Sequence, residues 1–419
     1  MTYCIYNIAT SLAAPLGAAW LASQARHRPL LERFDPNIPA LGGKPFWVHA
    51  CSVGEVNTAR ELLTALQQRW LGVPVLLTVS TRSGYELAQG AGVPVTWCPF
   101  DQVWCVRKFI KAINPRALLV IETELWPNLY RETRRSGAPV LLVSGRLSDK
   151  HYPQYVKLRS VLRPVLEQLS AAGMQNDEYA ARLISLGVEA SRVRVTGNIK
   201  FDNVRTAIEP DVLRALRNQV GIPEDKPVLL FGSTRPGDEA LAAACWQMLR
   251  DEFPDLLLVI APRHLERLSE ALAPFSGEQI LLRTVTQAGR RLTGERVLVL
   301  DTVGELAAFY GLATVAVVGG SFYPGVNGHN PLEPAGLGVT TVFGPHMRNF
   351  ADPARELVRH GGACQVEPAE LTDTLRRLLS DSDARRAMGK HAQQAVEANR
   401  GAVERTLDLL ETVLPKTTS

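Results

Sequence analysis

Hydrophobic residues occur along most of this chain as short continuous runs, and segments of helical spacing separate most of them. The runs of the first half lie at residues 45–50, 74–81, 94–100, 116–124 and 139–147. Between the first two, Ala59, Leu62 and Leu66 recur at helical spacing and predict one apolar helix face. Continuous apolar strands are typical of a parallel sheet that helices cover on both faces. The first half is therefore predicted to be a doubly wound α/β domain.

The same alternation starts again after a polar connection. Apolar runs follow at residues 227–234, 256–264, 279–284, 296–302, 314–321 and 340–345. We therefore expect an α/β protein with two doubly wound, Rossmann-like domains that face each other across a cleft. Ligands of such sheets bind at the carboxyl ends of the strands. The expected division is an N-terminal apolar helix (1–25), a first domain (30–205), a linker (206–226) and a second domain with C-terminal helices (227–419).

The N-terminal segment is uncharged over residues 1–25 and is followed directly by Arg-His-Arg. A membrane-spanning helix needs about 20 apolar residues, so the segment is just long enough, although Asn7 and Pro15 dilute it. Basic residues after the segment favour a cytoplasmic body. A cleaved signal peptide fits less well, because the basic residues lie on the wrong side of the apolar run. We expect an uncleaved anchor or a membrane-lying helix, with an ordinary docking helix as the alternative.

The composition of the 419 residues is that of a globular protein, with 46% hydrophobic and 21% charged residues. A net charge of +4 without a concentrated basic stripe does not indicate nucleic-acid binding, and it suits an anionic substrate or a membrane surface. The six cysteines lack metal-ligand spacing, which predicts buried free thiols in a reducing compartment. The phosphate-loop pattern GxxxxGK[ST], the GxSxG elbow and the HExxH zinc motif are all absent from the sequence.

Unusual polar residues of the first half follow the apolar runs. Glu55 stands in the first turn of a predicted helix, where it either complements the helix dipole or serves as a general base. Glu122 and Glu124 end another run, and burying two acids is unfavourable unless something pairs with them. Alternation would place both on one face of the strand, one supporting the other. Lys200 is either a solvated lysine or a partner for a carboxylate or phosphate.

In the second half, a glycine turn and a new helix start predict an anion-binding loop. Gly319 and Gly320 end an apolar run, and glycine lets a backbone approach a ligand closely. A helix start offers unpaired N–H groups to an anion. Asn330 and Glu333 also fit a capping box, which is the structural alternative for these two residues. Arg263 follows another run and is able to pair with a phosphate.

Ten segments, in order between about residues 30 and 350, together resemble the 3-deoxy-D-manno-octulosonic acid (Kdo) transferase family. The segments are HACSVGE (49–55), CPFD (98–101), IETELWPN (121–128), GRLSDK (145–150), GNIKFD (197–202), GSTRPGDE (232–239), APRHLER (261–267), DTVGEL (301–306), GHNPLEPA (328–335) and FGPHMRNF (343–350). The resemblance implies a glycosyltransferase of the GT-B architecture, anchored in the inner (cytoplasmic) membrane with its catalytic domains on the cytoplasmic face. It implies transfer of Kdo from CMP-Kdo to a lipid A precursor (lipid IV-A), with inversion and without a metal ion or other cofactor.

The resemblance also assigns roles to individual residues. It makes Glu55 the base that takes the proton of the acceptor hydroxyl, and it makes Glu122 and Lys200 stabilisers of the transition state. The residues that it assigns to CMP binding are Pro262, Arg263, Val303, Gly304, Glu305, Asn330, Pro331, Leu332 and Glu333.

Two positions depart from the family pattern. Arg235 stands where a histidine is common, and Asn327 stands where a second glycine is usual. Two other classes remain as alternatives: a soluble sugar-nucleotide 2-epimerase of the same architecture, and a non-catalytic lipid- or nucleotide-binding relative. The uncharged N-terminus and the SVGE loop argue against the epimerase, and an intact Glu55 argues against the non-catalytic relative.

Overall fold

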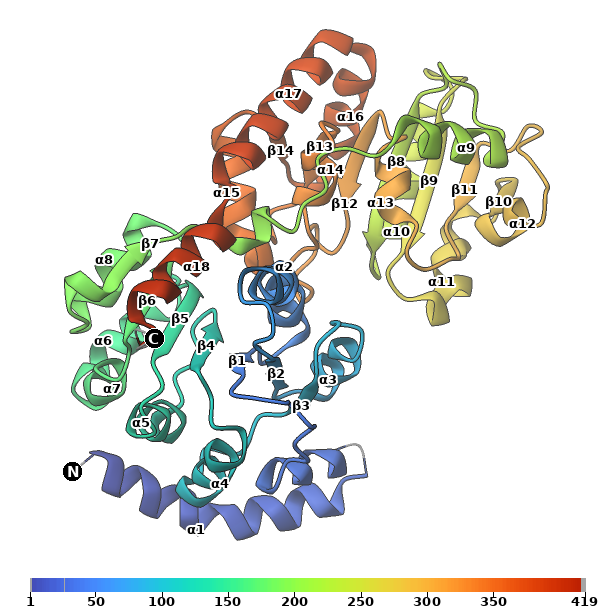
Figure 1. Cartoon of the computed structure of the whole chain (residues 1–419). Coiled ribbons are helices and arrows are strands. Elements are labelled where there is room, and N and C mark those ends of the chain that lie inside the picture. Colours follow the sequence, from blue (N-terminus) through green and yellow to red (C-terminus); the bar gives the residue numbers. More distant parts are fainter. Residues whose placement is uncertain (1, 26, 416–419) are drawn as a thin grey trace. The chain divides into compact units, whose positions relative to one another are not determined.

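The computed structural model describes residues 2–25 and 27–415, and it divides into two compact units (Figure 1). The chain up to Asn203 and from Asn399 onward forms the first unit, and Val204–Ala398 form the second. Each unit contains its own parallel sheet with helices on both faces. This is the doubly wound architecture that the alternating apolar runs predicted.

The first unit has a seven-stranded parallel sheet among its described residues, in the order β3-β2-β1-β4-β5-β6-β7. Its strands are β1 (Phe46–His49), β2 (Val75–Val79), β3 (Val95–Trp97), β4 (Ala117–Ile121), β5 (Val140–Gly145), β6 (Ala171–Met174) and β7 (Val193–Val195). Its helices are α1 (Thr2–Ser23), η1 (Arg28–Phe34), α2 (Val53–Arg69), α3 (Arg82–Ala88), α4 (Val103–Ile113), α5 (Pro127–Arg135), α6 (Tyr152–Lys157), α7 (Arg159–Leu166), α8 (Asp177–Ser185), η2 (Ala190–Arg192), η3 (Ile199–Phe201) and α18 (Ala402–Val413).

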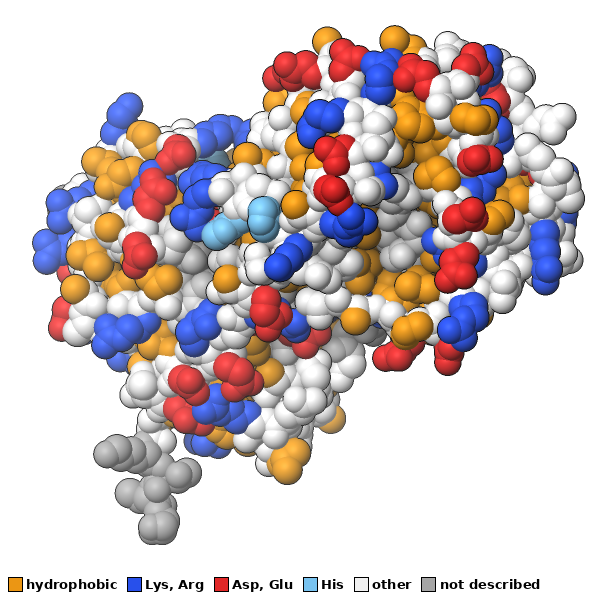
Figure 2. Space-filling model, turned by 90° about the horizontal axis from the view of Figure 1, so that it is seen from above, with side chains coloured by type: hydrophobic (Ala, Val, Ile, Leu, Met, Phe, Trp, Pro, Cys, Tyr) orange, Lys and Arg blue, Asp and Glu red, His pale blue; other side chains and the backbone are white. Residues whose placement is uncertain are grey.

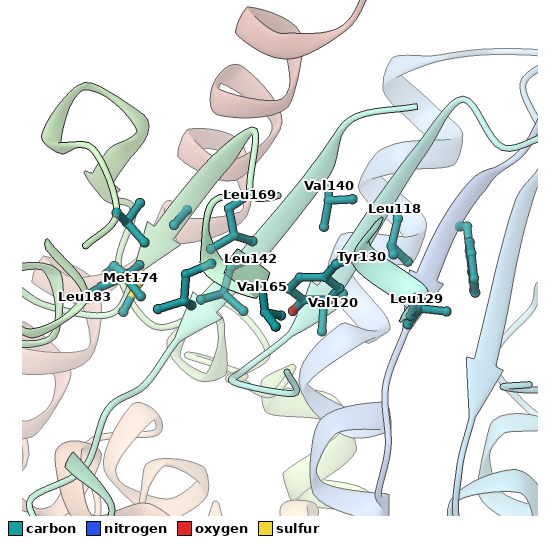
Figure 3. Close-up of a cluster of buried hydrophobic side chains, with 14 of the residues drawn as sticks. Leu118, Val120, Leu129, Tyr130, Val140, Leu142, Val165, Leu169, Met174 and Leu183 are labelled. Carbon is teal, nitrogen blue, oxygen red and sulfur yellow. The ribbon is translucent and has the colours of Figure 1, made fainter. Parts of the chain in front are cut away.

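Both faces of this sheet are buried, which explains why its strands read as unbroken apolar runs. Neighbouring residues of a strand point to opposite faces, so Trp47 joins one hydrophobic cluster while Phe46 and Val48 join the other. Figure 3 shows the first cluster, where side chains of β4, β5 and β6 meet those of α5, α7 and α8. Leu118 and Val120 lie there beside Tyr130, and all three are fully buried.

The second unit has its own seven-stranded parallel sheet among the described residues, in the order β10-β11-β9-β8-β12-β13-β14. Its strands are β8 (Val228–Thr234), β9 (Leu257–Pro262), β10 (Ile280–Leu282), β11 (Val297–Val299), β12 (Val315–Val318), β13 (Thr340–Phe343) and β14 (Ala363–Gln365). Its helices are α9 (Pro210–Val220), α10 (Asp238–Leu249), η4 (Leu265–Arg267), α11 (Leu268–Leu272), η5 (Ala273–Phe275), α12 (Arg283–Gln287), α13 (Leu306–Tyr310), α14 (Leu332–Gly336), η6 (Arg348–Phe350), α15 (Ala351–Arg359), η7 (Pro368–Glu370), α16 (Leu371–Ser380) and α17 (Ser382–Asn399).

The ends of the second unit differ from the division expected from sequence. Helix α9, inside the expected linker, belongs to the second unit, because Leu216 and Val220 are buried in its core. The last helix, α18, belongs to the first unit rather than to the second. Asp202 accepts hydrogen bonds from the N–H groups of Gly401 (2.7 Å) and Val403 (2.6 Å) at its start, and Leu410 is fully buried against the first sheet.

The surface shows the dispersed charge that the composition suggested. On the face seen in Figure 2, acidic and basic side chains are interspersed. Within the described residues, one helix is long and apolar enough to cross a membrane, and it covers Tyr3–Ser23 of α1. The six cysteines are all free, as expected, but the expectation that they are buried is correct only for Cys98, Cys105 and Cys245. Cys51 and Cys364 are partly exposed and Cys4 is exposed, because they lie after strand β1, in the edge strand β14 and on α1 respectively, rather than in a core.

Candidate active site

Glu55 lies just beyond the carboxyl end of β1, in the first turn of α2. Its Oε2 accepts a hydrogen bond from the N–H of Cys51 at 2.6 Å, and its Oε1 accepts one from the hydroxyl of Ser52 at 3.1 Å. Both donors belong to the chain that leads into the helix. Glu55 therefore also has a structural role at the helix start, where an acid complements the helix dipole. That role leaves the carboxyl half-buried rather than removing it from solvent.

The Glu55 carboxyl is strongly perturbed. Burial raises its pKa to about 8, the negative charges of Glu122 and Glu124 add to the rise, and the hydrogen bonds from Cys51 and Ser52 oppose it. A carboxyl with a pKa near the operating pH is suited to accept a proton and release it again. The structure thus supplies the physical condition that a general base requires.

Glu122 and Lys200 form an ion pair beside this carboxyl. Lys200 reaches from η3, after β7, and its Nζ lies 2.8 Å from Glu122 Oε1. Burial alone would raise the pKa of Glu122, but the charge and hydrogen bond of Lys200, together with Arg146, lower it overall. The sequence did not predict this pairing, because 78 residues separate the two side chains.

The backbone of Glu122 differs from the expected extended strand. Strand β4 ends at Ile121, and Glu122 has a φ of 57°, a left-handed conformation that non-glycine residues rarely adopt. The alternation argument for Glu122 and Glu124 therefore does not apply, because it assumed that the strand continues. Unusual backbone held at the end of a central strand is a common feature of functional sites.

Glu124 and Cys51 complete the group around Glu55. One oxygen of each glutamate and the sulfur of Cys51 all lie within 4.8 Å of one another, the one such group of possible metal ligands found among the described residues. Burial raises the pKa of the Cys51 thiol to about 12, so the thiol stays protonated near neutral pH. A thiol must lose its proton to bind a metal, so a cation held here would have to displace that proton.

Arg33 is a member of this neighbourhood that the sequence did not reveal. It is 8% exposed, and its Nε donates to the carbonyl of Cys98 at 2.9 Å while its guanidinium lies 4.4 Å from the ring centre of Phe100. Its charge acts on the thiols of Cys98 and Cys51 and on Glu124. No local pattern marks Arg33, because a buried arginine looks like any surface arginine in sequence.

In the second unit, the glycine turn after β12 is built by close backbone contacts. A side chain on Gly319 would lie 2.6 Å from the carbonyl oxygen of Ser233, and Gly320 has a φ of 66°. Asp238 is 1% exposed, and its Oδ2 accepts from the N–H of Gly320 at 2.6 Å and from that of Arg235 at 2.9 Å. The buried carboxylate thus ties the loops after β8 and β12 together.

A group of basic side chains surrounds this turn. The Nε of Arg235 donates to Nε2 of His329 at 3.2 Å, and burial together with Arg235, Arg263 and His264 lowers the pKa of His329 to about 4. Burial and the nearby charges of Arg263 and Arg267 also lower the pKa of Arg235. Mutual repulsion of this kind is relieved by an anion, so the group is suited to bind one.

The segments assigned to CMP binding follow neighbouring strands of the second sheet. Pro262 ends β9, and Arg263 directly after it is exposed. The 303–305 loop follows β11, with Val303 86% exposed and Gly304 at a φ of 93°. Because β11, β9, β8 and β12 are adjacent and parallel, their carboxyl-terminal loops line one edge of the sheet.

Three acidic or amide residues of these segments are partly engaged in local structure. Glu305 pairs with the buried Arg283 at 2.6 Å, and this pairing lowers its pKa against the opposing effect of burial. Asn330 Oδ1 accepts from the N–H of Leu332 at 3.1 Å, and its Nδ2 donates to Glu333 Oε1 at 3.3 Å. The start of α14 has Pro331 as its N-cap and no side-chain cap hydrogen bond, so the capping box anticipated for Asn330 and Glu333 does not form, while Pro331 and Leu332 are buried.

The architecture is that of a GT-B glycosyltransferase, two doubly wound parallel sheets with polar residues collected at strand ends. A glycosyltransferase from Rickettsia africae shows the same fold, with a TM-score of 0.60 and 10% identity over 89% of this chain and all of the other. A UDP-GlcNAc 2-epimerase from Neisseria meningitidis has a TM-score of 0.59 and 14% identity over 88% of this chain and all of its own. At these identities the likeness shows the fold alone.

Sequence comparison gives the family. The family model described as 3-deoxy-D-manno-octulosonic-acid transferase (kdotransferase) matches residues 24–203. A 3-deoxy-D-manno-octulosonic acid transferase from Bordetella pertussis is 35% identical, covering 97% of this chain and 98% of its own length. The Haemophilus influenzae protein of the same description is 32% identical over 88% of this chain and 87% of its own. The chain belongs to the Kdo transferase family, and it is a glycosyltransferase rather than the epimerase that shares its fold.

Proposed function

We propose that this chain transfers Kdo from CMP-Kdo to a hydroxyl of a lipid A precursor, lipid IV-A, at the cytoplasmic face of the inner membrane. The observation that carries the chemistry is the Glu55 carboxyl, whose pKa burial raises to about 8 beside an intact Glu122–Lys200 ion pair. Family membership supports the transferred sugar, and the basic residues around the glycine turn of the second unit support an anionic donor.

In the proposed reaction, ionised Glu55 takes the proton of the acceptor hydroxyl while the hydroxyl oxygen attacks the anomeric carbon of Kdo. The bond from that carbon to the phosphate oxygen of CMP breaks, and CMP leaves with the electron pair. Attack opposite to the leaving group inverts the configuration. One glycosidic bond replaces one ester bond, and the proton released by the acceptor resides on Glu55 and then passes to solvent.

The remaining residues stabilise charge and hold the donor. Lys200, positioned by Glu122, offers a cation to the carboxylate of Kdo or to charge that develops in the transition state. Arg263 and the helix starts after Gly304 and Pro331 offer donors to CMP, and Glu333 accepts from the ribose hydroxyls. These groups supply the stabilisation of the leaving group that a divalent cation provides in other enzymes, so the transfer proceeds without a metal ion.

The test is incubation of the purified chain with CMP-Kdo and lipid IV-A, with measurement of free CMP and of the Kdo-bearing lipid. The parent chain should form both products, and Glu55→Ala should form neither above background. Glu61→Gln, an exposed acid on the same helix α2, is the matched control and should retain turnover. Unchanged turnover of Glu55→Ala would overturn the base assignment, and absence of product from the parent would overturn the proposed substrates.

A further inference from the structure

Helix α1 presents a continuous hydrophobic stripe to solvent. The large apolar side chains of this stripe are up to 76% exposed. They follow one another at spacings of three or four residues along the whole helix. The stripe consists of Ile5, Ile8, Leu12, Leu16 and Trp20. Its members therefore share one helix face. A row of this length left bare in water is unfavourable and marks a surface that something covers.

The opposite face of α1 is polar in its first half, and it is attached to the first unit. Tyr6 donates to Asp101 Oδ2 at 2.9 Å, and Asn128 Nδ2 donates to Asn7 Oδ1 at 2.7 Å. The side chain of Gln102 donates to the carbonyl of Thr10 at 2.8 Å. Tyr3 adds a hydrogen bond to the carbonyl of Pro164 at 3.1 Å and a contact in which the Arg131 guanidinium lies 4.6 Å from its ring centre.

The groups of the first unit that hold α1 are themselves buried at the starts of α4 and α5. Asn128 is fully buried, and Asp101 and Gln102 are each 8% exposed. Asp101 also accepts from the N–H groups of Asn128 and Leu129, so it links the docked helix to the first turn of α5. Removal of α1 would leave several of these groups without their partners, which is unfavourable inside a protein.

Helix length does not distinguish a spanning from a lying helix. Twenty-two residues at 1.5 Å each extend for about 33 Å, close to the ~30 Å of a bilayer core. The polar face does distinguish them, because lipid surrounds a lone spanning helix on all sides and offers no partner to Tyr6 and Asn7. Only a helix that lies along the membrane surface keeps these contacts while its apolar stripe enters lipid.

Neighbouring side chains match the chemistry of an anionic membrane surface. Trp20 and Trp104, on the first turn of α4, are each 56% exposed, and tryptophan favours the boundary between lipid and water. The net charge of +4 also suits an anionic surface. An uncharged apolar stripe with exposed tryptophan nearby favours a lipid surface over the apolar face of a second protein chain.

We propose that α1 attaches this protein to an anionic bilayer by lying in the plane of its surface, docked on α4 and α5 through its polar face and inserted through its apolar stripe. The inference rests on the proposed membrane association and states its geometry: both ends of α1 stay on the side of the membrane that holds the rest of the chain. Figure 1 shows α1 extended alongside α4 in the first unit.

Cross-linking tests the docked geometry in membranes. In a Cys4→Ser background, Tyr3→Cys combined with Arg131→Cys, two partly exposed positions in contact, should be joined by a short bis-maleimide in the full chain bound to vesicles of phosphatidylethanolamine and phosphatidylglycerol. Leu16→Cys with Arg131→Cys is the matched control and should give no cross-link. Cross-linking in solution that disappears in the vesicle-bound fraction would overturn the lying geometry. The pair Ser11→Cys and Gln102→Cys serves the same purpose if the first pair fails to fold.

Flotation tests the inserted stripe. The double variant Leu12→Glu/Leu16→Glu should bind the same vesicles at least tenfold more weakly than the parent. Leu71→Glu, an 86% exposed leucine outside α1, should bind like the parent. Equal vesicle binding by the parent and both variants would overturn the inference. It would also be overturned if the parent bound no vesicles and instead formed dimers that the double variant does not form. Kdo transfer to detergent-dispersed lipid IV-A, measured in parallel, separates failure of the proposed reaction from failure of this attachment.

Discussion

The Nζ atom of Lys200 lies 2.8 Å from Oε1 of Glu122, although the two residues follow different strands of the first sheet. Glu122 follows the central strand β4, whereas Lys200 follows the edge strand β7. The pair therefore ties the edge of the sheet to the neighbourhood of Glu55. This relationship allows the structural and catalytic roles of Lys200 to be separated by experiment.

Lys200→Met should lower the free energy of unfolding by about 3 kcal/mol, because it leaves the largely buried Glu122 carboxylate without its cation. The double variant Lys200→Met/Glu122→Gln should recover most of that stability, because no unpaired charge remains. If Lys200 also stabilises the transition state, the double variant stays at least tenfold slower than the parent in kcat. Denaturant unfolding measures the stability, and steady-state assays measure kcat. If the double variant recovers both the stability and the kcat of the parent, the pair is purely structural.

The dependence of transfer on pH should report the Glu55 carboxyl. With a pKa raised to about 8, a general base becomes active as it ionises, so kcat/KM should rise with pH and level off above that value. Glu55→Gln should lower kcat by about 10²–10⁴-fold and remove this rise. A Glu55→Gln profile that still rises through pH 8 would assign the base to another residue.

Substitution of two residues beside Glu55 should shift the pH at which kcat/KM rises, in opposite directions. Ser52→Ala removes a hydrogen bond that lowers the pKa of Glu55, so the rise should shift to higher pH. Glu124→Gln removes a negative charge that raises this pKa, so the rise should shift to lower pH. Shifts in the same direction for both variants would contradict the electrostatic account.

Stability should depend on pH through the same carboxyl. The pKa of Glu55 is higher in the folded chain than its ordinary value, so its favourable contribution is present at low pH and is lost as pH rises through about 8. The melting temperature of Glu55→Gln relative to the parent should therefore increase by about 2–4 °C between pH 6 and pH 9. Calorimetry at both pH values checks this, and a constant difference would contradict it.

Arg263→Ala should weaken binding of CMP by about tenfold or more, because the variant removes a cation from the basic group of the second unit. Stability should change little, since Arg263 is exposed. Arg214→Ala, an exposed arginine on α9 in the same unit, is the control and should bind CMP like the parent. Titration calorimetry with CMP measures the difference, and equal affinities would remove Arg263 from the donor site.

Chelation should leave transfer unchanged. In the proposed reaction the basic side chains around the glycine turn, rather than a metal ion, meet the anionic donor. Kdo transfer after treatment with EDTA should therefore equal that of the untreated chain. The prediction is wrong if EDTA abolishes transfer and added Zn²⁺ or Mg²⁺ restores it. If Glu124→Gln also changes that metal dependence, the metal binds at the group formed by Cys51, Glu55 and Glu124.

Much of the fold was predictable because each buried strand carries its own signal. Runs such as 116–124 located β4, and the alternating pattern gave both doubly wound units. The sequence overextended β4 through Glu122, because an apolar run does not show where the backbone turns left-handed. It also assigned α18 to the second unit, since a helix pattern carries no information about which sheet the helix covers.

The candidate site was predictable in its parts and not in its connections. Motif residues such as Glu55 and Arg263 were found, but their partners were not. The pairing of Lys200 with Glu122 and the packing of Arg33 depend on contacts between distant segments. Asp238 lies inside the GSTRPGDE segment, yet its role in joining two loops follows only from the hydrogen bond that it accepts from the N–H of Gly320. Local sequence encodes residue types and helix starts, whereas side-chain partners depend on tertiary structure.

The return of α18 to the first unit has a consequence for biosynthesis. All seven strands of the first sheet are made before Val204, and α2 covers part of one of its faces. The last helix adds Leu407 and Leu410 to the same hydrophobic cluster. A nascent chain must therefore leave the rest of that apolar face uncovered while the ribosome makes the whole second unit. The enzyme cannot mature in simple order from its N-terminus, and a premature stop before Ala402 would disable the half of the molecule that was synthesised first.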